Sequence, residues 1–563
     1  MAKLPSKNAF ASETADSFGG IDRTDSLGKL SDTYDMANLR ILPDGSLIRR
    51  EGYTAVLNVQ APIRAAIDYP PDPDYVFVLS GEVLFSVNIT TGATLEIAQG
   101  FNLYAPAFFV HLAGHTYLFC EGIYCLLPNN VLVVEGYIPL VGRNWGADGG
   151  EIYEPRNILG FQIRIDYLLD RDTNVLFTGF DVSAVDAVYV NGKAVTGAYI
   201  ERQNVCLPAV FPAGTRVLLC LSLGMSVFDD VLAMISCTAG YNCGHDQDNV
   251  TFLYGGEDPS RLFLLRHATE QQVLESRVYY PDSSYLYCPA DPIIVNGLVG
   301  GIRAICGEPD CLIVSGQYET RRLTPNGDTP IPGIEGCLSP ASMTYYNQTA
   351  YLATPRGIRR LPLRSGDGDI ISTPLGDLLD SNVAQKALLY YNVYRDELLV
   401  KDTTDTVNSL YIYEPARRQW IRFININAEG FFNNAPGRSV GFWETYQLLK
   451  FENDQKVDAS TVNSSSAIPV YFKSRWTHLG QPDATKRLRR ARLTYTGKGT
   501  VTATVSDKNG DICQHTFSPI SRHSASFCDD AIRSGRTDQM QVMLYSNDSN
   551  SLRIHDFSLS AIK

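Results

Sequence analysis

The stretch IRAAIDYPPDPDYVFVLSGEVLFSVNITTGATLEIA, residues 63–98, contains four short runs in which apolar residues alternate with other residues. Glycine-containing turns at 80–82 and 90–92 join the later runs. A period of two predicts β-strands with one buried face, and tight turns between consecutive strands predict antiparallel pairing. The stretch therefore predicts a four-stranded antiparallel sheet.

The same pattern repeats along the chain. A second set follows at once over 108–135, and the set at 384–424 alternates clearly, with Trp420 expected in the core of its sheet. Looser sets are expected at 231–281, 301–330, 339–375 and 429–452. Four-stranded units at intervals of roughly 35–45 residues are typical of propeller blades. The sequence therefore predicts an all-β fold with a β-propeller of about seven blades, over 61–154 and 227–453.

Two segments interrupt this rhythm. Residues 155–226 contain short strands and the hairpin turn Asn191-Gly192, and they predict an inserted, Ig-like β-sandwich. Residues 467–563 predict a C-terminal β-sandwich, which the polar stretch 454–466 separates from the strand sets before it.

The first 60 residues differ from the rest. Residues 7–17 are polar and are expected to form an extended arm. A strand at 46–49 or 54–59 is expected to pair with the last blade, which would close the ring and remove an exposed sheet edge.

Composition narrows the class of protein. Hydrophobic residues make up 44% of the chain, charged residues 19%, and the 31 tyrosines favour sheet. The net charge of −13 argues against a protein whose main task is to grip nucleic-acid phosphates, although DNA could slide past an acidic wall. No apolar run is long enough for a transmembrane helix, and the N-terminus lacks the apolar region of a signal peptide, so synthesis in the cytoplasm is expected. The 12 cysteines have irregular spacings, which favours free and mostly buried thiols.

Metal ligands and catalytic groups are weakly represented. His111 and His115 have a spacing that suits a metal on a helix, but here it spans a strand and its turn. Cys237, Cys243 and His245 are weak metal candidates, because their spacing matches no familiar zinc finger and a plain connecting loop explains them. No nucleophile elbow or phosphate-binding loop occurs. The prediction is a protein that is not an enzyme and that has no cofactor and no metal.

One basic cluster interrupts the acidic chain, at 486–492. Alternating side chains on a strand should divide between the two faces, so a continuous basic stripe is not expected. Three interpretations stay open: a solvated strand edge, a contact with acidic neighbouring subunits, and a phosphate contact. The residues predicted as interface candidates are Arg49, Arg50, Lys486, Arg487, Arg489, Arg490 and Arg492.

Several short motifs occur in an order that resembles one known group of proteins. The segments GGID (19–22), DMANLR (35–40) and GSLIRREGY (45–53) resemble the entry segment of bacteriophage tail and head-to-tail propeller proteins. The later segments that continue the resemblance are YEPRNIL at 153–159, RLF at 261–263, YLYCP at 285–289, GCLSP at 336–340, YLATPRGI at 351–358, and Trp476 with Leu479, Gly480, Pro482 and Lys486.

The resemblance implies a virion structural protein, similar to the tail-nozzle or DNA-stabilisation proteins of short-tailed phages. Such proteins form six-fold rings below the portal. For this chain the resemblance implies self-association in six copies, contacts with other tail or connector proteins, and DNA that passes without tight binding. The inserted sandwich and the polar arm depart from the simplest nozzle pattern, so the position on the virion stays open. A receptor- or glycan-binding propeller and a propeller glycosidase are the alternatives.

Overall fold

The computed structural model describes residues 10–103, 107–112, 114–120, 122–133, 140–144, 153–157, 162–178, 182–223, 253–254, 261–265, 272–278, 286–287, 293–295, 298, 302–308, 311–324, 326–366, 368–379, 386–452, 457–461, 464–482, 484–517, 523–527 and 536–562. Within these ranges the regular structure consists of β-strands and two short 3₁₀ helices, η1 (Pro340–Ser342) and η2 (Thr373–Leu379). The all-β prediction is confirmed. In this described part no helix is long and apolar enough to cross a membrane.

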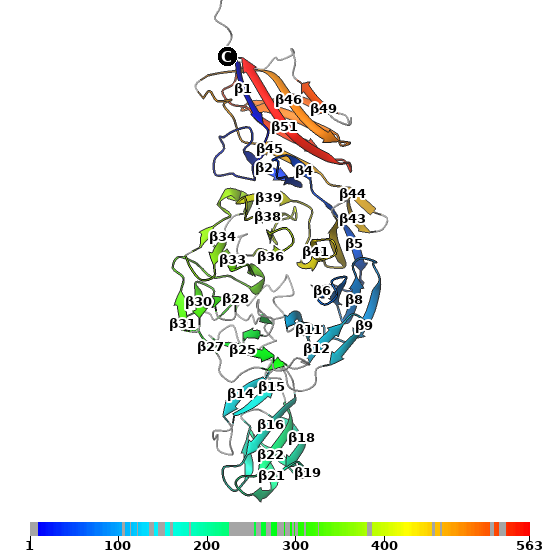
Figure 1. Ribbon diagram of the computed structural model, residues 1–563, viewed down its shortest axis with the longest axis vertical. Coiled ribbons are helices and arrows are strands. Elements are labelled where there is room, and N and C mark those ends of the chain that lie inside the picture. The colour runs from blue at the N-terminus through cyan, green and yellow to red at the C-terminus, as the bar shows by residue number, and fades with distance from the viewer. Residues whose placement is uncertain are drawn as a thin grey trace, which may run out of the picture. The chain divides into compact units, whose positions relative to one another are not determined.

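Antiparallel sheets of consecutive strands recur along the described part of the chain between 63 and 452 (Figure 1). The two sheets predicted over 63–98 and 108–135 are both present. The first contains β6 (Ile63–Asp68), β7 (Tyr75–Ser80), β8 (Val83–Asn88) and β9 (Thr94–Gln99), and the second contains β10 (Phe108–Leu112), β11 (His115–Cys120), β12 (Gly122–Leu127) and β13 (Asn130–Val133).

Three further sheets follow the same order along the chain. They are β23 (Leu253–Tyr254), β24 (Arg261–Leu265), β25 (Gln272–Val278) and β26 (Leu286–Tyr287), with β27 (Ile293–Ile294) beside β25; β28 (Ala304–Glu308), β29 (Cys311–Ser315), β30 (Thr320–Thr324) and β31 (Gly327–Pro330); and β32 (Met343–Tyr346), β33 (Thr349–Thr354), β34 (Gly357–Pro362) and β35 (Asp369–Ile370).

The set predicted at 384–424 forms β36 (Leu388–Asn392), β37 (Glu397–Lys401), β38 (Leu410–Glu414) and β39 (Gln419–Phe423). Trp420 is fully buried, as expected, and its indole Nε1 donates a hydrogen bond to the carbonyl of Ile371 at 2.7 Å. A buried indole that finds a backbone acceptor combines a large apolar contact with a satisfied polar group.

The last set is completed from the N-terminal part of the chain. It contains β40 (Gly430–Asn434), β41 (Ser439–Glu444) and β42 (Gln447–Glu452), and β5 (Gly52–Asn58) pairs antiparallel with β42. This is the pairing expected for a strand at 54–59. The sheet continues through the hairpin β43 (Val457–Thr461) and β44 (Ser464–Ala467), so the polar stretch at 454–466 is part of a sheet rather than only a boundary.

The insert consists of two small sheets. One contains β16 (Gln162–Leu168), β22 (Arg216–Leu223), β18 (Val182–Val190) and β19 (Lys193–Val195), and the other contains β17 (Thr173–Phe177), β21 (Asn204–Phe211) and β20 (Tyr199–Glu201). Buried side chains of both sheets, such as Leu219 and Leu176, share one apolar core. Asn191 and Gly192 both have positive φ, which the predicted two-residue hairpin turn requires. A short pair, β14 (Leu140–Asn144) and β15 (Tyr153–Asn157), precedes the insert.

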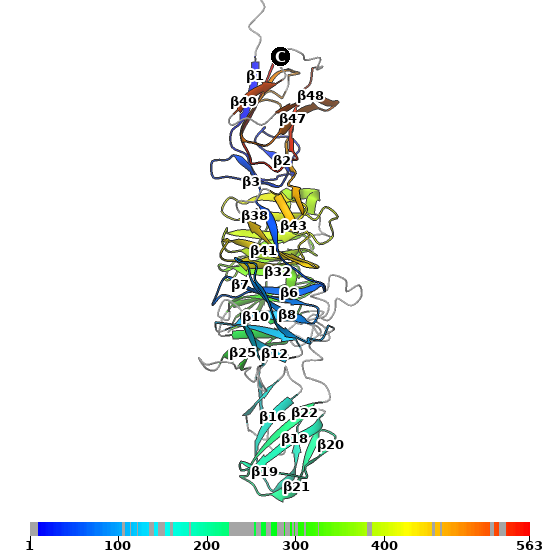
Figure 2. The same ribbon diagram turned by 90° about the vertical axis from the view of Figure 1, so that its right-hand side faces the viewer.

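By its internal contacts the chain divides into two compact units, one containing 1–58, 356–359 and 369–563 and the other containing 59–355 and 360–368. The first unit includes a two-sheet sandwich (Figure 2). Its six-stranded sheet has the order β3-β4-β51-β46-β49 with β1 beside β51, and its five-stranded sheet has the order β2-β45-β50-β47-β48. Their bounds are β1 (Phe10–Ala15), β2 (Thr33–Ala37), β3 (Leu39–Ile41), β4 (Leu47–Arg49), β45 (Val470–Ser474), β46 (Arg487–Gly497), β47 (Val501–Asp507), β48 (Gly510–Phe517), β49 (His523–Phe527), β50 (Gln541–Ser546) and β51 (Leu552–Ile562).

The sandwich therefore differs from the one predicted over 467–563. Four N-terminal strands complete its two sheets, since β1 and β4 pair with β51, β3 pairs with β4, and β2 pairs with β45. The segment expected as a polar arm includes β1, whose Ala11 and Ala15 are buried. The predicted arm is wrong for these residues, because serine and threonine on an outward face do not prevent a strand whose other face is buried.

Candidate functional site

The hairpin β3–β4 places three arginines inside the first unit. Arg40 is the middle residue of β3, Arg49 ends β4, and Arg50 follows it. The turn between the strands includes Gly45, whose φ is +81° and whose position leaves no room for a Cβ beside Ser17. A glycine there permits the left-handed backbone and the close approach, so the hairpin can lie against the N-terminal segment.

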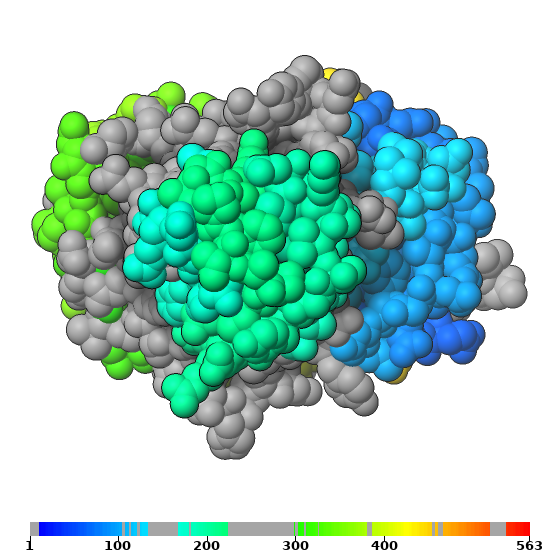
Figure 3. Space-filling view, turned by 90° about the horizontal axis from the view of Figure 1, so that it is seen from below, coloured from blue at the N-terminus to red at the C-terminus, as the bar shows by residue number. Residues whose placement is uncertain are grey.

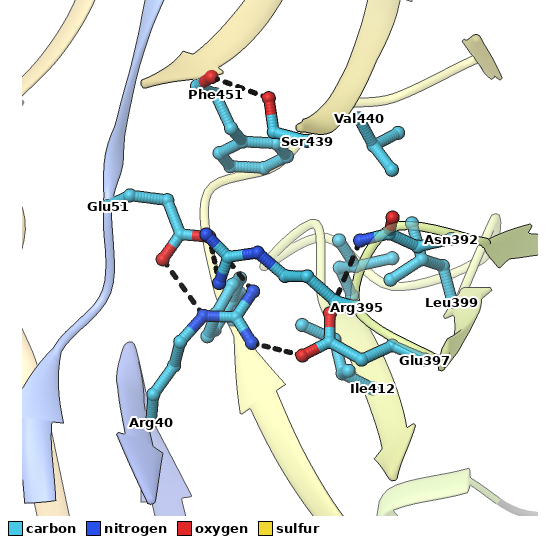
Figure 4. A pocket seen from close by; sticks show the side chains of 12 residues that line it. Arg40, Glu51, Asn392, Arg395, Glu397, Leu399, Ile412, Ser439, Val440 and Phe451 are labelled. Carbon is cyan, nitrogen blue, oxygen red and sulfur yellow. Dashed lines mark hydrogen bonds and ion pairs between the residues drawn. The ribbon is translucent and has the colours of Figure 1, made fainter. Parts of the chain in front are cut away.

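Arg40 lies between two carboxylates in a small pocket (Figure 4). Its Nε and Nη2 donate to the two oxygens of Glu51 at 2.8 and 2.9 Å, and its Nη1 donates to Glu397 at 2.5 Å. Arg395, from the turn between β36 and β37, forms a second ion pair with Glu51 at 3.0 Å. The carboxylate side chains are only 8% and 5% exposed, so this is a buried four-residue ion-pair network.

Burial and ion pairing have opposite net effects on the pKa values of the two carboxylates in the network. Burial would raise the pKa of Glu51, but the guanidinium groups of Arg40 and Arg395 outweigh it and lower this pKa to about 2. For Glu397 burial dominates and raises its pKa. Both carboxylates are enclosed and bound to guanidinium groups. This arrangement is typical of an ion-pair network that fixes the packing of strands, and less typical of an acid–base pair open to a substrate.

Arg50 forms a second buried ion pair. Its side chain is completely buried, and its Nη1 and Nη2 donate to the two carboxylate oxygens of Asp458 on β43 at 2.8 and 2.5 Å. Its Nε donates to the side-chain oxygen of Asn38 at 2.9 Å. Asn38 has a positive φ of 57° and also donates to the carbonyl of Pro469, so one residue fixes the bend before β3.

Arg49 points to the sandwich instead. Its guanidinium donates to the Ser546 hydroxyl and the Asn550 carbonyl, both at 2.8 Å, and pairs with Asp548 at 3.0 Å. Arg49 and Arg50 were predicted as inter-subunit candidates, but both are buried and bound within the chain. That prediction does not fit their burial.

The sequence did not reveal the acidic partners of these arginines. Glu51, Glu397, Asp458 and Asp548 are separated from them by up to several hundred residues. The sequence did contain one indication for Glu397. It is the first residue of the apolar strand ELLVK, all of whose residues are buried. A charge on a buried strand must have a partner, although the sequence does not say which one.

The basic cluster at 486–492 is arranged differently from the expectation. Lys486 is buried, and its ammonium donates to the carbonyls of Gln481 and Ala484. Arg487, Arg489, Arg490 and Arg492 are all exposed on β46. A β-bulge lies between Leu488 and Arg490 in the pairing with β51, and the extra residue brings Arg489 and Arg490 to the same outward side. The prediction that strand alternation divides these arginines between two faces is wrong.

The predicted metal candidates Cys237, Cys243 and His245 lie outside the described residues. His111 Nδ1 is 3.1 Å from the Thr116 hydroxyl, which places it in a polar contact on the β10–β11 hairpin. Among the residues that the structure describes, no group of three or more histidine, cysteine or acidic side chains is arranged to hold a metal ion. Seven of the described cysteines are free, and all of these except Cys220 are buried. Cys513 is disulfide-bonded, so the prediction of free thiols is wrong for that residue.

The outer face of the sheet β17-β21-β20 is unusually apolar. Val175, Phe177, Tyr199 and Val210 are 38%, 43%, 58% and 62% exposed, and the register puts Val175 and Tyr199 in one row across Cys206. Figure 3 shows the surface of the insert in teal. Grouped exposed apolar side chains of this kind usually mark a contact surface.

Comparisons with known proteins do not assign the chain. No protein-family profile matches it, and no curated protein matches it. Similar solved structures include the computationally designed Ika8 protein (7% identity, 71% of this chain and 99% of that chain, TM-score 0.37), and PorZ, a surface component of the type-IX secretion system of Porphyromonas gingivalis (10% identity, 77% and 44%, TM-score 0.30). A chain of the mitotic checkpoint complex is also similar (9% identity, 81% and 96%, TM-score 0.32). These similarities are too weak to support a fold or a function.

Proposed function

We propose that the chain is a virion structural protein of a bacteriophage tail or head-to-tail connector, assembled in the host cytoplasm as a ring of six copies. In this proposal the repeated antiparallel sheets are the blades of a β-propeller, about seven in number. The insert and the sandwich contact neighbouring tail components, and DNA passes through the ring without tight binding.

The buried entry segment carries the proposal. The motifs that resemble phage tail proteins lie at 19–22, 35–40 and 45–53, and several of their residues contact distant residues of the first unit. A Cβ on Gly20 would lie 2.6 Å from the Gln419 Cβ, and Ile21 donates to the Trp420 carbonyl at 2.7 Å. Arg49 and Arg50 bind acidic residues of the sandwich and of β43. Residues that carry the resemblance thus make specific contacts within the fold.

The chemistry of the pocket supports structural work over catalysis. Its carboxylates are enclosed and ion-paired, which stabilises one arrangement of strands but offers no free acid or base. Rigid modules with several side faces suit heterologous contacts, which generate rings when the rotation between copies closes.

Electron microscopy of the purified chain and of the virion tests the proposal. We expect a six-fold ring that matches density below the portal. A monomer at micromolar concentration that also binds a sugar would overturn it and favour a propeller that recognises glycans.

The apolar face of the insert favours that second function, a receptor- or glycan-binding protein of the virion surface. Aromatic rings such as Phe177 and Tyr199 can stack on sugars, and Asn204 and Glu201 on the neighbouring strands supply polar groups beside them. A glycan array on the full chain tests this function. Binding that disappears with Phe177→Ala and Tyr199→Ala would support it, and the absence of any binding would reject it.

A further inference from the structure

We infer that two asparagine–glycine turns, Asn326-Gly327 and Asn509-Gly510, are sites of spontaneous deamidation, and that a third, Asn191-Gly192, is protected by the fold. The modification needs water but no enzyme, partner or cofactor, and it does not depend on the proposed function. The remaining Asn-Gly pair of the sequence, at 296–297, lies outside the described residues.

The reaction takes place between an asparagine side chain and the backbone of the next residue. The backbone nitrogen of the glycine attacks the side-chain carbon Cγ, and the new C–N bond closes a succinimide ring. The bond from Cγ to the amide nitrogen breaks, and ammonia leaves with the proton that the glycine nitrogen has lost. Water then opens the ring at either carbonyl, which leaves an aspartate or an isoaspartate. Glycine favours the attack because it has no side chain beside its nitrogen and because its backbone rotates easily.

Asn509 lies in an open turn. Lys508 and Asn509 form the two-residue turn between β47 and β48, with Asp507 opposite Gly510. The backbone N–H of Asn509 donates to Asp507 Oδ1 at 2.7 Å, whereas its side-chain amide has no hydrogen bond within the described part of the chain. Asn509 and Gly510 are exposed, and a Cβ placed on Gly510 would meet no atom within 4 Å. The side chain can therefore turn toward the glycine nitrogen, and water can reach the ring that forms.

The turn at Asn326 repeats this arrangement in the unit that contains 59–355. Asn326 is the last turn residue between β30 and β31, with Thr324 opposite Gly327. The φ angles of Gly327 and Gly510 are alike, at +122° and +136°. Asn326 is exposed, and among the described residues none forms a hydrogen bond with its side chain. Two turns in different units thus present the same reactive pair in a similar backbone conformation.

The hairpin turn at Asn191 differs because both ends of this residue are held. Its backbone N–H donates to the Arg216 carbonyl at 2.8 Å, and its side-chain oxygen accepts a hydrogen bond from the Arg216 N–H at 3.1 Å. These two bonds tie Asn191 to β22, the strand beside β18. Reacting groups that are held out of position react more slowly by orders of magnitude, so the tie should slow ring closure. Exposure alone does not make this distinction, since Asn191 and Gly192 are exposed as well.

The modification at Asn509 should alter one hairpin without unfolding its sheet. The new carboxylate lies in sequence between Asp507 and Asp511, where it adds like charge to the turn. An isoaspartate also lengthens the backbone of the turn by one methylene group. Because β48 is an edge strand and its Cys513 is disulfide-bonded, the strand has a covalent tie that the turn does not control. We therefore expect local loosening of the β47–β48 turn in a chain that stays folded.

Peptide mapping by mass spectrometry, on the full chain incubated at mildly alkaline pH, tests the inference. Each conversion adds about 1 Da to one peptide. The same incubation in concentrated guanidinium chloride gives the intrinsic rate of each Asn-Gly pair, because the unfolded chain has no fixed turns. In the folded chain we expect rates at Asn326 and Asn509 within about threefold of the intrinsic rates, and a rate at Asn191 at least about tenfold below its intrinsic rate.

Two variants separate these sites from the rest of the chain. Asn326→Gln/Asn509→Gln keeps both amides but lengthens the side chains, which disfavours the ring, so most of the acidic forms that ion-exchange chromatography separates from aged protein should be lost. Asn191→Gly keeps the residue type that the positive φ of this turn requires, and it should leave those acidic forms unchanged. Conversion at Asn191 as fast as at Asn509 in the folded chain would overturn the inference. So would Asn326 and Asn509 that stay unmodified in the folded chain while they convert in the unfolded one.

Discussion

Arg49-Arg50 and Arg489-Arg490 are two pairs of adjacent arginines, and both lie at strands that pair with β51. The first pair is buried, with each guanidinium bound to a carboxylate of a different part of the first unit. The second pair is exposed, because a bulge turns both side chains away from the core. Identical dipeptides thus hold the fold together in one place and face solvent in the other.

The difference shows that the dipeptide Arg-Arg on a strand does not by itself determine whether its side chains are buried or exposed. Arg49 ends β4 and Arg50 follows it, so the chain can send the two side chains in different directions toward acidic partners. Arg489 and Arg490 lie inside a long strand, where only an irregular backbone can keep both outward. The free energy of unfolding should therefore respond very differently to changes at the two pairs.

The largest effect is expected at Arg50. Arg50→Met should lower the free energy of unfolding by about 3–5 kcal/mol, because it leaves the buried Asp458 carboxylate without its partner. Urea denaturation followed by tryptophan fluorescence measures the change. Arg438→Met, at an exposed position, is the control, and Arg50→Met/Asp458→Leu should recover much of the loss. A cost below about 1 kcal/mol would remove the distinction between the two pairs.

Glu51 should have the next largest effect, with a characteristic pH dependence. Glu51→Gln should cost about 2–3 kcal/mol at neutral pH, because two arginines lose their shared carboxylate. The pKa of Glu51 falls from 4.5 to about 2 on folding, so its contribution is present above pH 4.5 and is lost as the pH falls toward 2. The difference between wild type and variant in urea titrations should therefore narrow between those values. A difference that stays constant down to low pH would contradict the network.

The effect of Glu444 on stability should have the opposite pH dependence to that of Glu51. Burial, with the carboxylates of Glu429 and Asp458, raises the pKa of Glu444 from 4.5 to about 7. The folded state then holds a proton that the unfolded state has lost, so stability falls as the pH rises from 4.5 to 7. Glu444→Gln should raise the free energy of unfolding by about 1 kcal/mol at pH 8 and should have no such benefit near pH 4. Thermal melts at the two pH values measure this, and equal effects at both would reject it.

The smallest effect on stability is expected at the exposed pair. Arg489→Gln/Arg490→Gln should change the free energy of unfolding by no more than about 0.5 kcal/mol, because exposed side chains lose little on substitution. Urea denaturation under the conditions used for Arg50→Met makes the comparison direct. A loss similar to that of Arg50→Met would show that Arg489 and Arg490 stabilise the fold as much as the buried pair does.

The sequence predicted local structure well where alternation and turns act together. The strands of the first set, the buried Trp420 and the Asn191-Gly192 turn all follow from residues within a few positions of one another. The pairing of β5 with β42 was also expected, since an edge strand needs a partner. The sequence alone thus determined the all-β class and the strand positions of the clearest sets, because a period of two and turn chemistry are local properties.

The tertiary structure decided everything that depends on distant partners. It placed β1, β2 and β4 in the sandwich, joined Arg40 to a carboxylate 357 positions away, and joined Arg50 to one 408 positions away. It also placed Arg489 and Arg490 on the same side of β46, through one extra residue in the register with β51. Burial and bulges are set by which strands meet, and no local pattern at 49–50 or 489–490 reports that.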